Sequence, residues 1–94
     1  MQLYAIRRRN GWKDGPALEA AAAKSTAEGE KMPNDVRWIR SYVLAEDDGS
    51  LGTVCIYEAS SPEKIREHAQ RVGMPADEIS TVADTVVVRP DPGA

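Results

Sequence analysis

Short stretches rich in β-branched and aromatic residues occur at four places along this chain, separated by stretches whose apolar residues recur at helical spacing. The first kind of pattern predicts strands and the second predicts helices. The predicted strands are Met1 to Arg8, Val36 to Ala45, Leu51 to Ala59 and Ile79 to Arg89. The predicted helices cover residues 16–28 and 62–72. The order is therefore strand, helix, strand, strand, helix, strand.

Both predicted helices are bounded by residues that favour helix ends. Pro16 suits the first turn of the first helix, and Gly29 supplies its end. The second helix has the clearer start, because a serine that can cap the first turn precedes a proline. The residues that bound it are Ser61, Pro62 and Gly73.

This order of elements predicts a ferredoxin-like α+β fold of the βαββαβ type, with a four-stranded antiparallel sheet and two helices on one face. We expect one domain over residues 1–89, followed by a frayed C-terminal tail over residues 90–94. A chain of 94 residues builds a small core with a thin margin of stability. Association with a second copy would add to that margin.

The turn chemistry of Glu46 to Gly49 predicts a hairpin between the second and third strands. With these four residues as the loop, Ala45 lies opposite Ser50 and Trp38 lies opposite Tyr57. Alternation then assigns each side chain to one of the two faces of the sheet. The face expected to pack on the helices carries Ile39, Ser41, Val43, Gly52, Val54 and Ile56. The opposite face carries Trp38, Arg40, Tyr42, Thr53, Cys55 and Tyr57.

The second of these faces is the candidate binding surface. Three aromatic side chains exceed the apolar area that a soluble monomer normally leaves exposed, so we expect a second subunit or a ligand to cover them. An arginine among them needs a carboxylate, a phosphate or a ring face. The candidate ligand-binding residues are therefore Trp38, Arg40, Tyr42, Cys55 and Tyr57.

The chain contains one cysteine, Cys55, and one histidine, His68. The predicted register places them on opposite sides of the sheet, so they are not expected to meet within one subunit. For Cys55, a reactive thiol near Arg40 competes with a small buried hydrophobic residue. For His68, metal ligation or proton transfer competes with a half-buried side chain at the flank of a helix.

Composition narrows the class of protein. The net charge is −3 and 29% of the residues are charged, which argues against a general nucleic-acid-binding protein. The basic segment Arg7 to Lys13 is either a solvated strand end or an anion-binding loop. No apolar run approaches a membrane span or a signal peptide, so we expect a cytoplasmic protein with no membrane partner. A single cysteine excludes an internal disulfide.

Three segments of the chain resemble a family of small bacterial domains of unknown function that includes a nickel-binding protein. They are Val36-Arg-Trp-Ile-Arg-Ser-Tyr-Val, Cys55-Ile-Tyr-Glu-Ala-Ser-Ser-Pro-Glu-Lys-Ile-Arg-Glu-His and Gly73-Met-Pro-Ala-Asp-Glu-Ile. The resemblance implies a ferredoxin-like fold, a dimer and a nickel site built largely from histidines. Of such histidines this chain has only His68, and Arg40 stands where the relatives commonly have a histidine.

These observations lead to two hypotheses about function. The first is a homodimeric, non-catalytic protein that binds a metal ion or a small anionic ligand at a sheet face or a cleft between subunits. The second is a small dimeric α/β-barrel enzyme that uses His68 or Tyr57 as its acid or base. The fold by itself does not choose between them.

Overall fold

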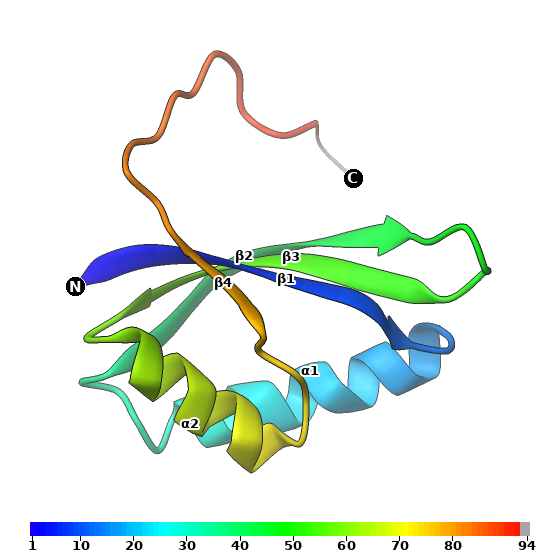
Figure 1. Ribbon diagram of the computed structural model, residues 1–94, viewed down its shortest axis with the longest axis horizontal. Coiled ribbons are helices and arrows are strands. Elements are labelled where there is room, and N and C mark those ends of the chain that lie inside the picture. Colours follow the sequence, from blue (N-terminus) through cyan, green and yellow to red (C-terminus); the bar gives the residue numbers. More distant parts are fainter. Residues whose placement is uncertain (93–94) are drawn as a thin grey trace.

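The computed structural model describes residues 1–92 and contains the six elements in the predicted order. The strands are β1 (Gln2–Trp12), β2 (Val36–Ala45), β3 (Leu51–Ala59) and β4 (Glu78–Thr81), and the helices are α1 (Gly15–Gly29) and α2 (Pro62–Val72). The sheet has the strand order β2-β3-β1-β4, and every neighbouring pair is antiparallel. Both helices cover the same face of the sheet (Figure 1). The predicted ferredoxin-like α+β fold is confirmed.

The helix ends follow from local capping chemistry. The Asp14 carboxylate accepts a hydrogen bond from the backbone N–H of Ala17 at 2.9 Å, which satisfies a free donor of the first turn of α1. The side chain of Ser61 caps α2 in the same way. Gly73 ends α2 with a φ of +85°, a conformation that glycine adopts without steric cost. The caps of α2 are those that the sequence predicts.

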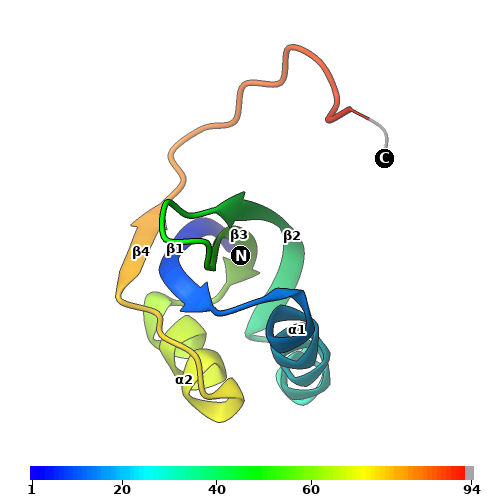
Figure 2. The ribbon, with the colours of Figure 1, turned by 90° about the vertical axis from the view of Figure 1, so that its right-hand side faces the viewer.

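Strands β1 and β4 end at other residues than predicted. Strand β1 continues past Arg8 to Trp12 after a break in its pairing with β3. Strand β4 ends at Thr81, not at Arg89, so the prediction of a long last strand is wrong. The reason is the length of its partner, because Thr81 already lies opposite Tyr4, close to the start of β1. The chain then leaves the sheet and arches over the face opposite the helices (Figure 2). Of the predicted tail, residues 93–94 lie outside the described part.

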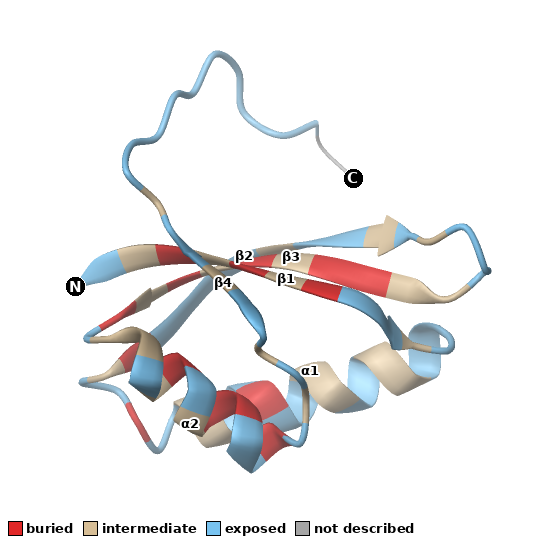
Figure 3. Ribbon diagram, in the orientation of Figure 1, coloured by how far each residue is buried: buried red, intermediate tan, exposed pale blue. Residues whose placement is uncertain are grey.

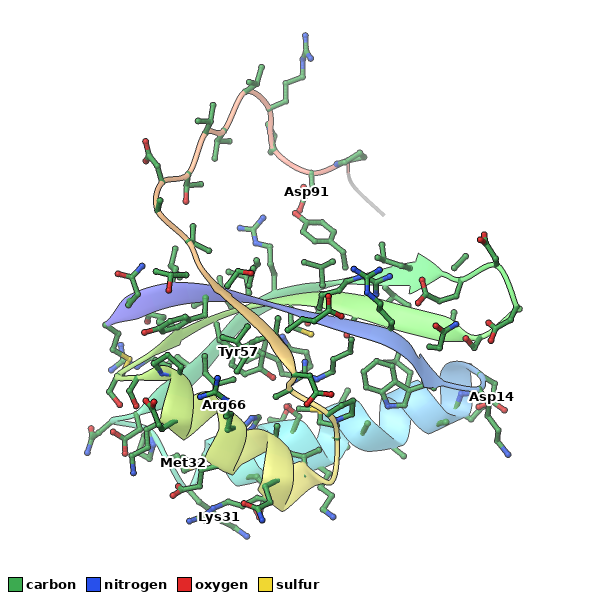
Figure 4. All side chains as sticks on the ribbon, viewed as in Figure 1. Asp14, Lys31, Met32, Tyr57, Arg66 and Asp91 are labelled. Carbon is green, nitrogen blue, oxygen red and sulfur yellow. The ribbon has the colours of Figure 1, made fainter. Side chains whose placement is uncertain are left out.

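The hairpin has a different register from the predicted one. Ala45 pairs with Leu51, so the loop has one more residue than expected, and a bulge at Ile39 restores the predicted pairing of Trp38 with Tyr57. The prediction that Thr53, Cys55 and Tyr57 face away from the helices is wrong, because all three are buried on the helix side. Figure 4 shows Tyr57 between the sheet and the helices.

The core fills the space between the sheet and α2. Its largest fully buried apolar side chains are Ile6, Tyr57 and Ile65, from β1, β3 and α2. Figure 3 shows the buried positions gathered on the strands and on the inner sides of the helices. None of the helices in the part that the structure describes is long and apolar enough to cross a lipid bilayer.

An ion pair beside the hairpin loop connects β1 to the end of β2. The guanidinium of Arg7 donates to the Glu46 carboxylate at 2.9 Å, and the backbone N–H of Asn10 donates to the same carboxylate at 2.8 Å. These two contacts, the Asn10 N–H first, hold the pKa of Glu46 below its usual range. Gly52 lies against this pair, where a Cβ atom would come within 2.6 Å of the nearest Arg7 nitrogen and 2.7 Å of the carboxylate.

We therefore expect Gly52→Ala to lower the free energy of unfolding by about 1–3 kcal/mol, because the new methyl group displaces the ion pair and meets the Arg8 carbonyl oxygen at 2.7 Å. Urea unfolding followed by circular dichroism measures this change. Gly15→Ala is the matched control, since nothing lies within 4 Å of a Cβ atom there. Equal stability of the two variants would contradict the close packing around Gly52.

Candidate functional site

A cavity of about 440 Å³ lies between α1 and the sheet. Its walls come from β1, β2, β3 and α1, with Met74 closing it after α2. The lining residues are Arg8, Trp12, Leu18, Ala21, Ala22, Ser25, Trp38, Ile39, Arg40, Ser41, Val43, Thr53, Cys55, Tyr57 and Met74. A volume of this size is typical of sites for small organic ligands.

The cavity exists because α1 presents small side chains to the sheet. Ala21 and Ala22 face it where a core helix would usually present leucine or isoleucine, and Ser25 is the buried residue of the helix. Alanine favours the helix but fills little of the space between helix and sheet. Helix α2 presents larger buried residues such as Ile65 and Val72 to the core, and the cavity lies on the α1 side.

Arg8 is the most unusual residue of the cavity, because its side chain is charged and only 2% exposed. Its Nε donates to the carbonyl oxygen of Pro75 at 2.6 Å, and its Nη1 donates to the Cys55 sulfur at 3.3 Å. Nη2 has no hydrogen-bond partner among residues 1–92, and no carboxylate of that range forms an ion pair with Arg8. A buried guanidinium without a counter-charge is costly.

Thr53 adds a second unsatisfied group beside Arg8. The two residues are direct cross-strand partners in the β1–β3 pairing, so their side chains are neighbours on one face. The Thr53 hydroxyl is buried and has no hydrogen-bond partner in the described chain. Buried polar groups are nearly always hydrogen-bonded, so two adjacent exceptions in one cavity point to a ligand.

Tyr57 lies at the junction of the cavity with α2. Its hydroxyl is 3.1 Å from the Ser25 hydroxyl, its ring stacks on Trp38 with centroids 6.1 Å apart, and burial raises the pKa of the phenol. The Ser25 carbonyl lies 2.9 Å from Nε2 of His68, whose ring is tilted against Tyr57. Both rings thus meet α1 at a single serine.

The structure divides the predicted binding residues into two groups. Trp38, Cys55 and Tyr57 line the cavity on the helix side. Arg40, which also borders the cavity, and Tyr42 contact Asp91 of the C-terminal tail, the arginine at 3.2 Å and the tyrosine hydroxyl at 2.8 Å. Figure 4 shows Asp91 on the tail, on the side of the sheet opposite the helices. The expectation that these residues share one face is wrong, because the extra loop residue shifts β2 against β3 from Ala45 to the bulge. Arg40 does find the carboxylate that its charge requires.

Cys55 and His68 lie on the same side of the sheet, contrary to the prediction. Cys55 is buried against Arg8, while Arg40, its predicted neighbour, lies opposite Ile56. His68 is 1% exposed, so it belongs to the core and not to a half-exposed flank. Cys55 thus matches the alternative of a small buried hydrophobic residue, whereas His68 is buried more deeply than the half-buried side chain expected at the flank of the helix.

The donor atoms present do not form a nickel site. His68 is the one histidine of the chain; its Nε2 lies beside the Ser25 carbonyl, and its Nδ1 is buried without a partner within residues 1–92. Within residues 1–92, no three histidine, cysteine, aspartate or glutamate side chains are grouped as metal ligands. Nickel prefers imidazole nitrogens, and guanidinium groups do not bind it.

Sequence reasoning missed Arg8, Thr53 and Ser25. Arg8 belongs to the basic segment interpreted from the sequence as either a solvated strand end or an anion-binding loop, and its burial was not predicted, yet it follows Tyr4 and Ile6 at intervals of two residues. That alternation puts Arg8 on the buried face of β1, and it was the signal available in the sequence. Ser25 and Thr53 carry no comparable signal.

The fold and the cavity define a small ferredoxin-like α+β domain with an arginine-containing cavity between a helix and the sheet. The chain belongs to the family described as nickel responsive protein SCO4226-like, which matches residues 4–82. Among solved structures, the crystal structure of SCO4226 from Streptomyces coelicolor A3(2) is similar, with a TM-score of 0.69 and 21% sequence identity over 89% of this chain and 99% of that one. No curated protein sequence matches the chain.

We expect Tyr57→Phe to lower the free energy of unfolding at neutral pH by about 1 kcal/mol, because it removes the bond to Ser25. Burial raises the pKa of Tyr57 in the folded state, so the unfolded chain releases this proton first. The contribution of the neutral phenol is therefore full below about pH 10, the ordinary tyrosine pKa, and falls as pH rises above it. Urea unfolding at pH 7 and pH 10.5 measures both effects. If the difference in free energy of unfolding between the wild type and Tyr57→Phe does not shrink at pH 10.5, the phenol is not buried in its neutral form.

Proposed function

We propose that this protein is a homodimeric binding protein for a small anion, held at Arg8 in the cavity between α1 and the sheet. The observation that supports this proposal is the buried Arg8 guanidinium, which has an unused Nη2 and no carboxylate partner within residues 1–92. An anion in the cavity would supply both the missing hydrogen bonds and the missing charge. Positive charge in a cavity with apolar walls also attracts anions more strongly than the same charge in water.

A metal ion fits the residues of this chain less well than an anion does. The family description names nickel, but this chain has a single histidine, and within residues 1–92 no three potential ligand side chains are grouped. A cation in the cavity would also lie near the unpaired charge of Arg8, which is unfavourable. The nickel response of the family therefore does not transfer to this chain in our proposal.

An acid–base role for His68 or Tyr57 stays a prediction. The two rings lie 5.6 Å apart, but both are buried and both are bonded to Ser25. The raised pKa of Tyr57 keeps its proton on the phenol at neutral pH, which suits a hydrogen-bond donor better than a base. Binding without catalysis is the simpler reading of this arrangement.

The proposed dimer forms through the sheet face that the helices leave open. Ile39 and Tyr42 are exposed on this face, and the tail above it carries Val86, which is 85% exposed, followed by two more exposed valines. A hollow of about 780 Å³ separates the tail from the sheet and is lined by these apolar groups together with Leu3, Ile56 and Val82, and by the charged residues Arg40, Asp84, Arg89 and Asp91. A second copy that presents the same face would bury them together, as expected for a two-fold symmetric interface.

The anion is tested by titrating tag-free protein with sodium phosphate, sodium sulfate, sodium hexanoate and nickel chloride, with backbone amide NMR shifts as the readout. We expect at least one anion to shift the amides around Arg8 and Thr53, and Arg8→Gln to weaken this binding by about tenfold or more. Arg9→Gln is the matched control, because Arg9 is exposed and paired with Glu78.

Two results would overturn the anion proposal. One is the absence of any saturable, Arg8-dependent shift with all three anions. The other is saturable nickel binding that His68→Ala abolishes. That result would show that the ligand of this chain is a metal ion. Thermal unfolding of Arg8→Gln shows whether that variant is folded, and the further variants described below remain informative if it is not.

The dimer is tested by sedimentation equilibrium. We expect twice the chain mass of 10.2 kDa at micromolar concentration, and a shift of Val86→Glu toward the monomer, because a buried carboxylate disfavours the apolar interface. Ala20→Glu is the control, since Ala20 is an exposed residue of α1 on the opposite layer. A monomeric wild-type protein, or an unchanged dimer of Val86→Glu, would contradict the proposed interface.

A further inference from the structure

We infer that the anion is the carboxylate of a small organic acid whose apolar body fills the rest of the cavity; this inference rests on the proposed function. The Arg8 and Thr53 side chains would hold the carboxylate, and the walls formed by Trp38, Leu18 and the alanines of α1 would hold the body. Three features of the cavity support this ligand class.

The first feature is the balance of charge. Arg8 contributes one buried positive charge, and no aspartate or glutamate of the described residues lines the cavity. Arg40 also lies on the cavity wall, but its charge is paired with Asp91. One free positive charge is neutralised by a monoanion, whereas a doubly charged phosphate or sulfate would leave a net negative charge in an apolar site. A single carboxylate therefore fits the charge of the cavity.

The second feature is the placement of the two unsatisfied groups. Arg8 and Thr53 are cross-strand partners, so the free Nη2 and the free hydroxyl belong to neighbouring side chains on one face of the sheet. A carboxylate has two acceptor oxygens and can take a hydrogen bond from each of two neighbouring donors. The Nε of Arg8 is fixed by Pro75 and its Nη1 by Cys55, so the guanidinium is held in place before a ligand arrives.

The third feature is the chemistry of the remaining wall. Beyond the Arg8 end, the cavity is lined mainly by Trp38, Leu18, Ala21, Ala22, Val43 and Met74. An inorganic anion would occupy only a small part of about 440 Å³ and would leave these surfaces without contacts. An aliphatic or aromatic body attached to the carboxylate would cover them, and its burial would add to the affinity.

The experiment compares hexanoate with 1-hexanol, which has the same chain length and no charge, and with inorganic phosphate, all by NMR titration of the full chain. We expect hexanoate to bind about tenfold or more tightly than either of the other two. Thr53→Val should weaken hexanoate binding about fivefold and leave hexanol unchanged, since it removes one hydroxyl and keeps the shape. Ala21→Leu should weaken hexanoate and hexanol together, because it fills the cavity.

The outcomes separate this inference from the proposed function. If phosphate binds at Arg8 and hexanoate does not, the anion site stands and the organic acid is wrong. If hexanol binds as tightly as hexanoate, or if Thr53→Val leaves hexanoate affinity unchanged, the carboxylate assignment is wrong. If none of the anions binds in an Arg8-dependent way, the proposed function itself is overturned. Thr53→Val and Ala21→Leu keep the test decisive if Arg8→Gln does not fold.

Discussion

The contacts of Ser25 determine how the two layers of this domain fit together. Its hydroxyl meets the phenol of Tyr57 and its carbonyl meets the imidazole of His68, so one residue of α1 is tied to β3 and to α2 at once. Because Ser25 is the buried residue of a helix that otherwise presents mainly alanine, α1 is fixed to the sheet near this point and stands off from it elsewhere. The cavity is the space between α1 and the sheet that results. The residues on both sides of this space line the cavity because α1 is held at Ser25.

The parts of the fold that depend on local chemistry could be predicted from the sequence. The serine cap and terminal glycine of α2, the limits of β2 and β3, and the order of the elements all rest on residues close together in the chain. The register of the hairpin could not be predicted in the same way. Glu46, the first residue of the loop, is held by Arg7 and by the Asn10 N–H from β1. Because Arg7 and Glu46 are 39 residues apart, the sequence of the turn does not indicate this contact. The end of β4 likewise depends on where β1 begins.

The site was predicted only in part, and the reason is the composition of the strands. Trp38, Cys55 and Tyr57 do line the cavity, but they were placed on the wrong side of the sheet because aliphatic residues usually face a core. Here the aliphatic Ile39 is exposed, whereas Tyr57 is buried with its hydroxyl beside that of Ser25. Arg8 is buried with its Nε bonded to Pro75 and its Nη1 to Cys55, while its Nη2 has no partner within residues 1–92. Which polar side chain finds a partner in a distant element cannot be read from alternation alone.

The two tryptophans of this chain, Trp12 and Trp38, both line the cavity, although they come from different strands. Trp38 is in addition stacked on a phenol ring with an angle of 5° between the planes. The tryptophan fluorescence of the folded protein, excited selectively at the red edge of the absorption band, therefore originates from the walls of this cavity. The domain contains a built-in optical reporter whose emission responds to a change in the polarity or the water content of that space.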